Sequence, residues 1–99
     1  MAPYAIDDLK RIITPIAQLH GVQSVSVFGS YARGSASAQS DVDLKIEKGT
    51  LKSLFQLCSF RLAVEDALNL SVDMVTDESS DRAFLEAIKK DEVLLYRKS

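Results

Sequence analysis

The spacing of apolar residues predicts a chain that alternates between helices and strands. A first helix is expected over residues 4–20, because apolar residues recur there at three- and four-residue steps: Ile6, Leu9, Ile13, Ile16 and Leu19. Gly21 is placed to end this helix, and His20 is interpreted as a C-terminal residue that faces the helix dipole. Residues 22–28 alternate valines with serines, which is typical of a strand.

The remaining chain continues this alternation. Small and polar residues over 29–40 indicate a loop around at most a short helix. A strand is expected over 41–46, a helix over 51–68 and a strand over 70–75. A last helix then begins near Ser79 or Ser80, which are suitable N-caps, and a strand over 93–96 closes the chain. The buried residues of this last helix are expected to be Phe84, Leu85 and Ile88. The order αβ(α)βαβαβ predicts an α/β (α+β) fold, in which helices pack on one face of a small mixed β-sheet.

The long helix over 51–68 carries more apolar residues than one core-facing stripe requires. Its main set is Leu51, Leu54, Phe55, Cys58 and Leu62. A second set widens the stripe: Leu57, Phe60, Val64 and Leu68. Cys58 lies in the middle of the stripe and is expected in the core. Either the helix is mostly buried or one edge is an interface, and exposed Leu57, Phe60 or Val64 would favour a partner surface.

Composition narrows the class of protein. Ninety-nine residues, 46% hydrophobic and 26% charged, predict a single domain over 1–99 with one core. There is no apolar run of the roughly 18–20 residues that span a bilayer, and acids stand where a secretory signal carries bases, so a cytoplasmic location is expected. One cysteine and one histidine exclude a disulfide framework and a multi-histidine zinc site. A net charge of −2 argues against strong autonomous binding of nucleic acid.

Two carboxylates on the second predicted strand are the first sign of chemistry. Asp41 and Asp43 are two residues apart, so they project to the same face of a strand. Adjacent carboxylates repel each other unless cations neutralise them. Mg²⁺ suits this role because it binds a few hard oxygens together with phosphate oxygens of a substrate. Two such ions about 4 Å apart can hold the attacking and leaving oxygens of a phosphoryl transfer.

A glycine and a serine end the preceding strand. Gly29 allows the backbone to approach a phosphate closely, and Ser30 would open a short helix with free N–H groups. Arg33, one turn later, is either a phosphate contact or a surface charge. Gly29 lies at the end of one strand and Asp41 at the start of the next. If the two strands are neighbours, they must therefore run antiparallel for both residues to reach one triphosphate. The helix over 51–68, in contrast, suits a parallel crossover to the third strand.

The third predicted strand supplies another acid. Leu70, Val72 and Met74 face one way, whereas Asp73 faces the other way. An acid opposite the packing residues of an apolar strand has few purely structural explanations. Beside Asp41 and Asp43, it could bind the catalytic ion or accept the proton of an attacking hydroxyl.

The segment GSYARGSASAQSDVDL, with Asp73 downstream, resembles the nucleotidyltransferase superfamily of DNA polymerase β, and especially its minimal nucleotidyltransferase (MNT) members. The resemblance covers nearly the whole chain. It implies that Gly29 and Ser30 hold nucleotide phosphates, with Arg33 as a further candidate contact, and that Asp41, Asp43 and Asp73 are catalytic and bind Mg²⁺. The chain departs from the pattern at Asp91-Glu92, where small members often have glycine. We expect this departure to alter the turn and to leave the site untouched.

The resemblance also implies a reaction and a partner. The expected activity is the Mg²⁺-dependent transfer of AMP from ATP to a hydroxyl. MNT proteins of this size resemble the antitoxins of HEPN–MNT toxin–antitoxin pairs, which implies a tyrosine of a HEPN ribonuclease toxin as the acceptor. Two alternatives stay open: a non-catalytic antitoxin that neutralises its partner by binding, and a small-molecule nucleotidyltransferase. The residues leave the nucleotide preference and the homo- or hetero-oligomeric state open.

Overall fold

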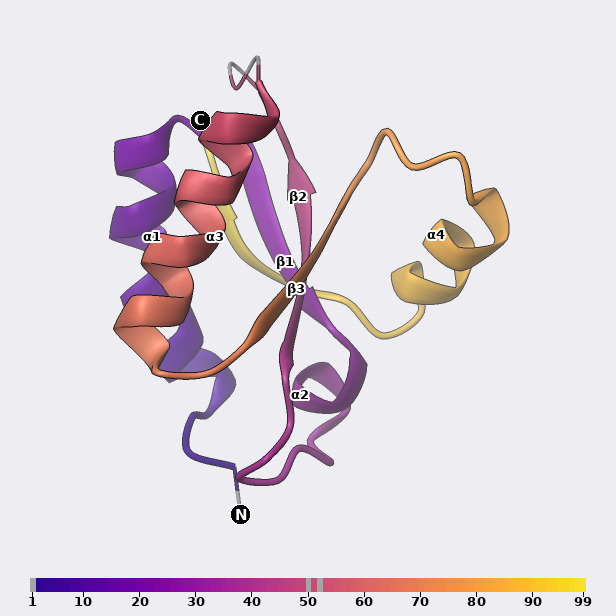
Figure 1. The fold of residues 1–99 in the computed structure, drawn as a ribbon. Helices are drawn as coiled ribbons and strands as arrows, with labels where there is room; N and C mark the ends of the chain where they lie inside the picture. Colours follow the sequence, from indigo (N-terminus) through magenta and orange to yellow (C-terminus); the bar gives the residue numbers. More distant parts are fainter. Residues whose placement is uncertain (1, 50, 52) are drawn as a thin grey trace.

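A computed structural model describes residues 2–49, 51 and 53–99, and its elements follow the predicted order (Figure 1). In chain order they are α1 (Ile6–His20), β1 (Ser24–Phe28), α2 (Gly29–Arg33), β2 (Val42–Glu47), α3 (Leu54–Leu68), β3 (Val72–Thr76), α4 (Arg82–Lys89) and β4 (Val93–Arg97). The predicted loop over 29–40 contains the short helix α2, as expected. None of the helices in the described ranges has the length and apolar character needed to cross a membrane.

The four strands form one mixed sheet in the order β3-β2-β1-β4. The central strand β1 is antiparallel to both β2 and β4, which confirms the antiparallel arrangement predicted for the first two strands. Strand β3 is parallel to β2, which confirms that α3 serves as a parallel crossover. The end of β1 and the start of β2 therefore lie at the same end of the sheet.

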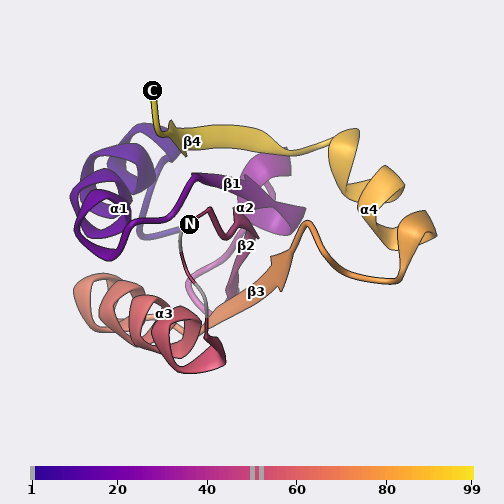
Figure 2. The same ribbon diagram turned by 90° about the horizontal axis from the view of Figure 1, so that it is seen from above.

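The core lies between the sheet and the two long helices. Figures 1 and 2 show α1 and α3 side by side on one face, whereas α4 stands on the opposite side of the sheet. Every second residue of β2 faces α1 and α3, so Val42, Leu44 and Ile46 are fully buried. Leu9 and Ile13 of α1 are fully buried against them. The other face of the sheet is thus left for polar side chains along most of its length.

The ends of the helices show which residues fix their boundaries. Gly21 ends α1 in the left-handed conformation, with φ of 74°, as predicted. Ser53 accepts a hydrogen bond from the backbone N–H of Gln56 and begins α3. The N-cap of α4 is Asp81, whose carboxylate accepts from the Phe84 N–H at 3.0 Å. The prediction of Ser79 or Ser80 as the cap is therefore wrong by one or two residues.

Helix α3 is rotated relative to the prediction. Its buried residues are Phe60, Val64 and Leu68, all from the set expected only to widen the stripe. Most of the main set is on the surface: Leu54 is 76% exposed, Phe55 84% and Leu62 59%, and Cys58 is exposed. Apolar residues surround this helix almost evenly, so their pattern does not define the face that packs against the sheet.

The exposed apolar residues of α3 continue onto α1. Leu19 is 84% exposed, although the periodicity placed it on the buried face of α1. Leu19 and Phe55 line a pocket of about 270 Å³ together with His20, Leu51, Gln56 and Ser59. We call this pocket and its rim the α1–α3 apolar surface. The sequence left open whether this helix is buried or forms an interface, and exposed Leu57, Phe60 or Val64 would have favoured the interface. Phe60 and Val64 are fully buried and Leu57 is partly buried against the core, so these three residues do not form a partner surface.

Two leucines of α3 test this orientation. Leu68→Ala removes a side chain that is 1% exposed and should lower the free energy of unfolding by about 2–5 kcal/mol. Leu62→Ala, at a position that is 59% exposed in the same helix, should change it by less than about 0.5 kcal/mol. Urea unfolding followed by circular dichroism measures both. Equal losses in the two variants would contradict the orientation of α3.

Candidate active site

Cross-strand pairing places two predicted site residues, Asp43 and Asp73, in one row with Phe28, the residue before Gly29. Phe28 of β1 lies opposite Asp43 of β2, and Asp43 lies opposite Asp73 of β3. Asp43 is half-buried and Asp73 is exposed, whereas their neighbours Val42 and Val72 are buried toward the helices. Both carboxylates therefore project from the face opposite α1 and α3, as the sequence predicts.

Asp41 completes the acidic group at the beginning of β2. It precedes Val42, whose N–H donates to the Ser71 carbonyl at 3.0 Å and so starts the pairing with β3. Partial burial raises the pKa of Asp43, and the charges of Asp73 and Asp41 raise it further, whereas Arg33 lowers it. The charge state of Asp43 therefore depends on both other acids and on the arginine.

The acidic group leaves room for ligands from a substrate. Within the described ranges, no three His, Cys, Asp or Glu side chains are drawn together closely enough to hold a metal ion by themselves. Mg²⁺ typically takes one or two carboxylates and completes its shell with water and phosphate oxygens. The charges of Asp73 and Asp41 raise the pKa of Asp43, and a bound cation would offset this repulsion. The acidic group therefore suits this mode of binding. That Asp73 joins Asp41 and Asp43 as a ligand stays a prediction.

Gly29 lies against the acidic group. Its φ of +72° favours glycine, and a Cβ atom at this position would collide with Oδ2 of Asp43. Gly29 is the first residue of α2, and the preceding N-cap, Phe28, provides no side-chain hydrogen bond to the first turn. The backbone at the start of α2 therefore lies next to Asp43, where the sequence predicts a phosphate contact. That Ser30 adds its hydroxyl to this contact stays a prediction.

Arg33 contacts Asp91, which lies in the turn before β4. Its guanidinium lies 3.4 Å from a carboxylate oxygen of Asp91, and both side chains are about half exposed. The adjacent Glu92 forms a less exposed ion pair with Lys45 at 2.9 Å. The sequence predicted that Asp91-Glu92 leaves the site untouched, but Asp91 pairs with Arg33, which is one of the candidate phosphate contacts. That Arg33 belongs to the site stays a prediction. Pairing of β4 with β1 brings the turn before β4 alongside α2 and β2.

An aromatic pocket adjoins Gly29 on the side away from Asp73. It measures about 260 Å³ and is lined by Phe28, Gly29, Arg33, Phe84, Ala87, Ile88 and Asp91. The rings of Phe28 and Phe84 meet edge to face, with centroids 6.0 Å apart. Of the three residues expected to be buried in α4, only Ile88 is, and Phe84 is 39% exposed. The sequence did carry a signal for this pocket: Phe84 is an aromatic residue on the short amphipathic helix α4, which follows the strand that contains Asp73.

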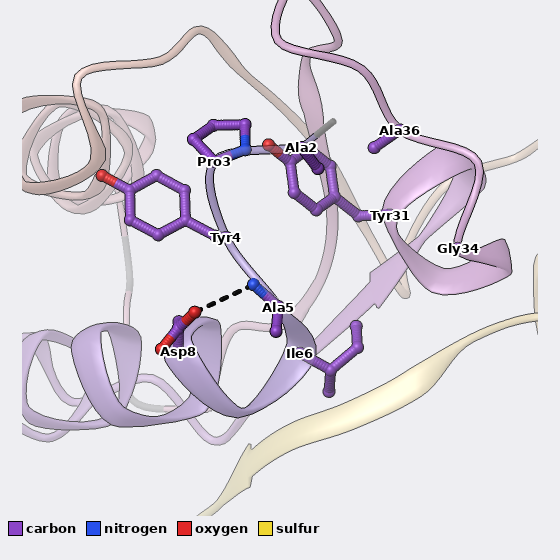
Figure 3. Close-up of a pocket in the computed structure, with 9 residues that line it drawn as sticks. All are labelled: Ala2, Pro3, Tyr4, Ala5, Ile6, Asp8, Tyr31, Gly34 and Ala36. Atoms are coloured by element: carbon purple, nitrogen blue, oxygen red, sulfur yellow. Dashed lines mark hydrogen bonds between the residues drawn. The ribbon is translucent and has the colours of Figure 1, made fainter.

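A larger pocket lies away from the acids. It measures about 540 Å³ and lies between the N-terminal segment and the loop after α2 (Figure 3). Its side chains are mainly Ala, Pro, Ile and Tyr, and Asp8 already accepts from the Ala5 N–H at 3.0 Å. Tyr31, which is 4% exposed, separates this pocket from the sheet core. The pocket contains none of the predicted site residues, so its size does not mark the chemistry.

Relatives of similar length match most of this chain. The chain is 40% identical over 88 residues to a Methanocaldococcus jannaschii protein named "Putative protein adenylyltransferase MJ0435", covering 84% of this chain and 95% of that protein. It is 29% identical over 97 residues to "Protein adenylyltransferase MntA" of Thermococcus cleftensis, covering 94% of this chain and 98% of that protein.

Solved structures share the fold. A structure described as a "putative minimal nucleotidyltransferase" superposes with a TM-score of 0.78 at 26% identity, covering 94% of this chain and 98% of that one. A toxin–antitoxin structure with AMP-PNP gives 0.77 at 18% identity, covering 91% and 74%. A tri-AMPylated Shewanella oneidensis HEPN toxin in complex with its MNT antitoxin gives 0.71 at 16% identity, covering 94% and 73%. The last two likenesses concern the fold alone.

The family assignment rests on most of the sequence. A family model described as "Polymerase beta, Nucleotidyltransferase" matches residues 10–99. This range includes Gly29, Ser30 and the three acids Asp41, Asp43 and Asp73. The chain therefore belongs to the polymerase β nucleotidyltransferase family.

Proposed function

We propose that this protein transfers AMP from ATP to a protein hydroxyl in a reaction that requires Mg²⁺. The observation that carries the proposal is the row formed by Asp43 and Asp73, with Asp41 beside it and Gly29 in contact with Asp43. Acids at this place could hold metal ions while the start of α2 holds phosphates. One end of the sheet thus offers both halves of a phosphoryl-transfer site.

The reaction divides the site residues by role. Asp41 and Asp43 would hold Mg²⁺, which supplies positive charge against the phosphate oxygens. Gly29 and Ser30 would bind the triphosphate through backbone N–H groups and the serine hydroxyl, with Arg33 within electrostatic reach of Asp43. The acceptor oxygen attacks the α-phosphorus, the bond from that phosphorus to the bridging oxygen breaks, and pyrophosphate leaves. Asp73 accepts the proton of the attacking hydroxyl.

We propose a HEPN toxin as the partner and one of its tyrosines as the acceptor. Two relatives carry the name protein adenylyltransferase, and a structural neighbour is an MNT antitoxin bound to an AMPylated HEPN toxin. The α1–α3 apolar surface supports a protein partner of some kind, because Leu19 and Phe55 are each 84% exposed.

Intact mass spectrometry tests this proposal. The protein is incubated with ATP, Mg²⁺ and a candidate HEPN partner, and the partner should gain one or more AMP masses. Complex formation without a mass gain would instead favour the non-catalytic antitoxin. Consumption of ATP only in the presence of a small hydroxyl compound would favour the small-molecule enzyme.

Removal of one metal-binding carboxylate should abolish most of the activity. Asp41→Asn or Asp43→Asn should lower the rate of AMP transfer by about 10²–10³-fold, because each removes a main electrostatic stabiliser of the transition state. The rate is measured with radiolabelled ATP. Asp66→Asn, an exposed position in α3, is the matched control and should keep the wild-type rate. Normal transfer by the Asp43→Asn protein would end the assignment.

Gly29 and Gly34 have similar backbone conformations but different surroundings. Comparing Ala variants of the two separates the effect of backbone strain from that of a steric collision with Asp43. Gly29 has φ of +72° and Gly34 has φ of +77°, but a Cβ atom meets Asp43 only at Gly29 and nothing within 4 Å at Gly34. Both Gly→Ala variants should lose similar stability. Only Gly29→Ala should lose activity, by about 10²-fold, because it displaces Asp43. Stability and kcat/KM are measured for both, and equal activity would show that the contact with Asp43 is dispensable.

The negative charge of Asp43 should lower the stability of the folded protein when no metal is bound. Its pKa is raised, so the native protein binds this proton more tightly than the unfolded chain does. Stability attributable to Asp43 therefore falls as the pH rises from about 4 through the raised pKa. Asp43→Asn should raise the Tm at pH 7 without Mg²⁺, and the gain should vanish near pH 3. Thermal unfolding across this range checks the sign, and a lower Tm in the variant at pH 7 would contradict it.

A further inference from the structure

We propose that the aromatic pocket between Phe28 and Phe84 binds the nucleobase of the triphosphate, and that Asp91 at its rim favours bases with an exocyclic amino group. The inference rests on the proposed function, because it assigns the base-binding part of the same site. It goes further by naming the residues of α4 and of the following turn that would select the nucleotide.

The position of the pocket assigns it to the donor nucleotide. Asp43 stands between Asp73 in β3 and Phe28 in β1, so the pocket and Asp73 lie on opposite flanks of Asp43. In phosphoryl transfer the attacking and leaving oxygens are roughly in line, on opposite sides of the phosphorus. An acceptor hydroxyl that gives its proton to Asp73 enters from the β3 flank. The β1 flank is left for the nucleotide.

The pocket also shares residues with the expected phosphate site. Gly29 and Arg33 line the pocket and belong to α2, whose first turn lies beside Asp43. A ligand with its phosphates at α2 can therefore reach the pocket without leaving the surface. The two sites are continuous, as a nucleoside triphosphate requires.

The lining of the pocket suits a flat aromatic ring. Phe28 and Phe84 offer two ring surfaces inclined at 82°, and Ile88, at 4% exposed, provides an apolar base. Phe84 is 39% exposed, so part of its ring remains available to a ligand. Base–aromatic stacking is tolerant of base identity, so these residues supply affinity and not selectivity.

Selectivity would come from the rim. Asp91 is a carboxylate and can only accept hydrogen bonds when ionised, and it can accept more than the contact with Arg33 at 3.4 Å. Adenine, cytosine and guanine each carry an exocyclic amino group, whereas uracil carries only carbonyl oxygens. A carboxylate attracts the amino group and repels the carbonyl oxygen. This makes Asp91 the residue expected to disfavour UTP.

Binding measurements with three probes test the assignment. Isothermal titration calorimetry with Mg²⁺ compares non-hydrolysable analogues of ATP and UTP with inorganic tripolyphosphate, which lacks a base. Phe84→Ala should weaken binding of the ATP analogue by about 5- to 100-fold and leave tripolyphosphate binding within twofold. Phe84→Trp should restore the affinity for the ATP analogue. Asp91→Asn should reduce the preference for the ATP over the UTP analogue, and Phe55→Ala is the control at an exposed aromatic residue.

Four other results would contradict either the base site or the proposed function. Unchanged binding of the ATP analogue by Phe84→Ala would overturn the base site, as would an equal loss of tripolyphosphate binding, which would indicate a structural effect. A raised KM for the acceptor protein with unchanged ATP affinity would assign the pocket to the acceptor instead and overturn the inference. If Phe84→Ala binds ATP normally while the wild type transfers AMP, only this inference fails. If the wild type binds the ATP analogue through Phe84 but never transfers AMP, only the proposed function fails.

Discussion

The register between β1, β2 and β3 is the constraint on which the candidate site depends. Pairing of Phe28 with Asp43, and of Asp43 with Asp73, places the residues of the row at adjacent positions on one face. A slip of one residue would turn Asp43 into the helical layer, because successive strand residues face opposite sides. The alternate residues of β2 prevent such a slip, since Val42, Leu44 and Ile46 are fully buried beneath α1 and α3. The hydrophobic core thus aligns the acids without touching them.

The site conflicts with the stability of the metal-free fold in two places. Asp43 is partly buried next to two like charges, which raise its pKa, and Gly29 takes a backbone conformation that other residues rarely adopt. Neither feature helps the sheet or the core. Both have an explanation if a cation and a triphosphate bind there, because the cation offsets the repulsion and the missing Cβ lets the backbone approach the acid. Violations of local rules are expected to gather at functional sites.

The sequence predicted the parts of the site that depend on local periodicity. The alternation in β2 and β3 set the faces of Asp43 and Asp73, and the small residues after Phe28 marked the start of α2. The contacts of Asp91 could not be predicted this way. This residue meets Arg33 across 58 positions of the chain, and only the pairing of β4 with β1 brings them together. The face of α3 was missed for another reason: its apolar residues lie all around the helix, so tertiary packing decides which of them are buried.

The candidate site and the α1–α3 apolar surface lie at opposite ends of the sheet. The surface includes the last turn of α1 and the first turn of α3, at the end where Ser24 pairs with Glu47 (Figure 1). The acids lie at the other end, where Phe28 pairs with Asp43. A partner seated on Leu19 and Phe55 would therefore leave Asp43 uncovered. Its acceptor hydroxyl would have to come from a distant segment or from another copy of the partner. Binding and AMP transfer are then separable, so tight complex formation would not by itself argue against catalysis.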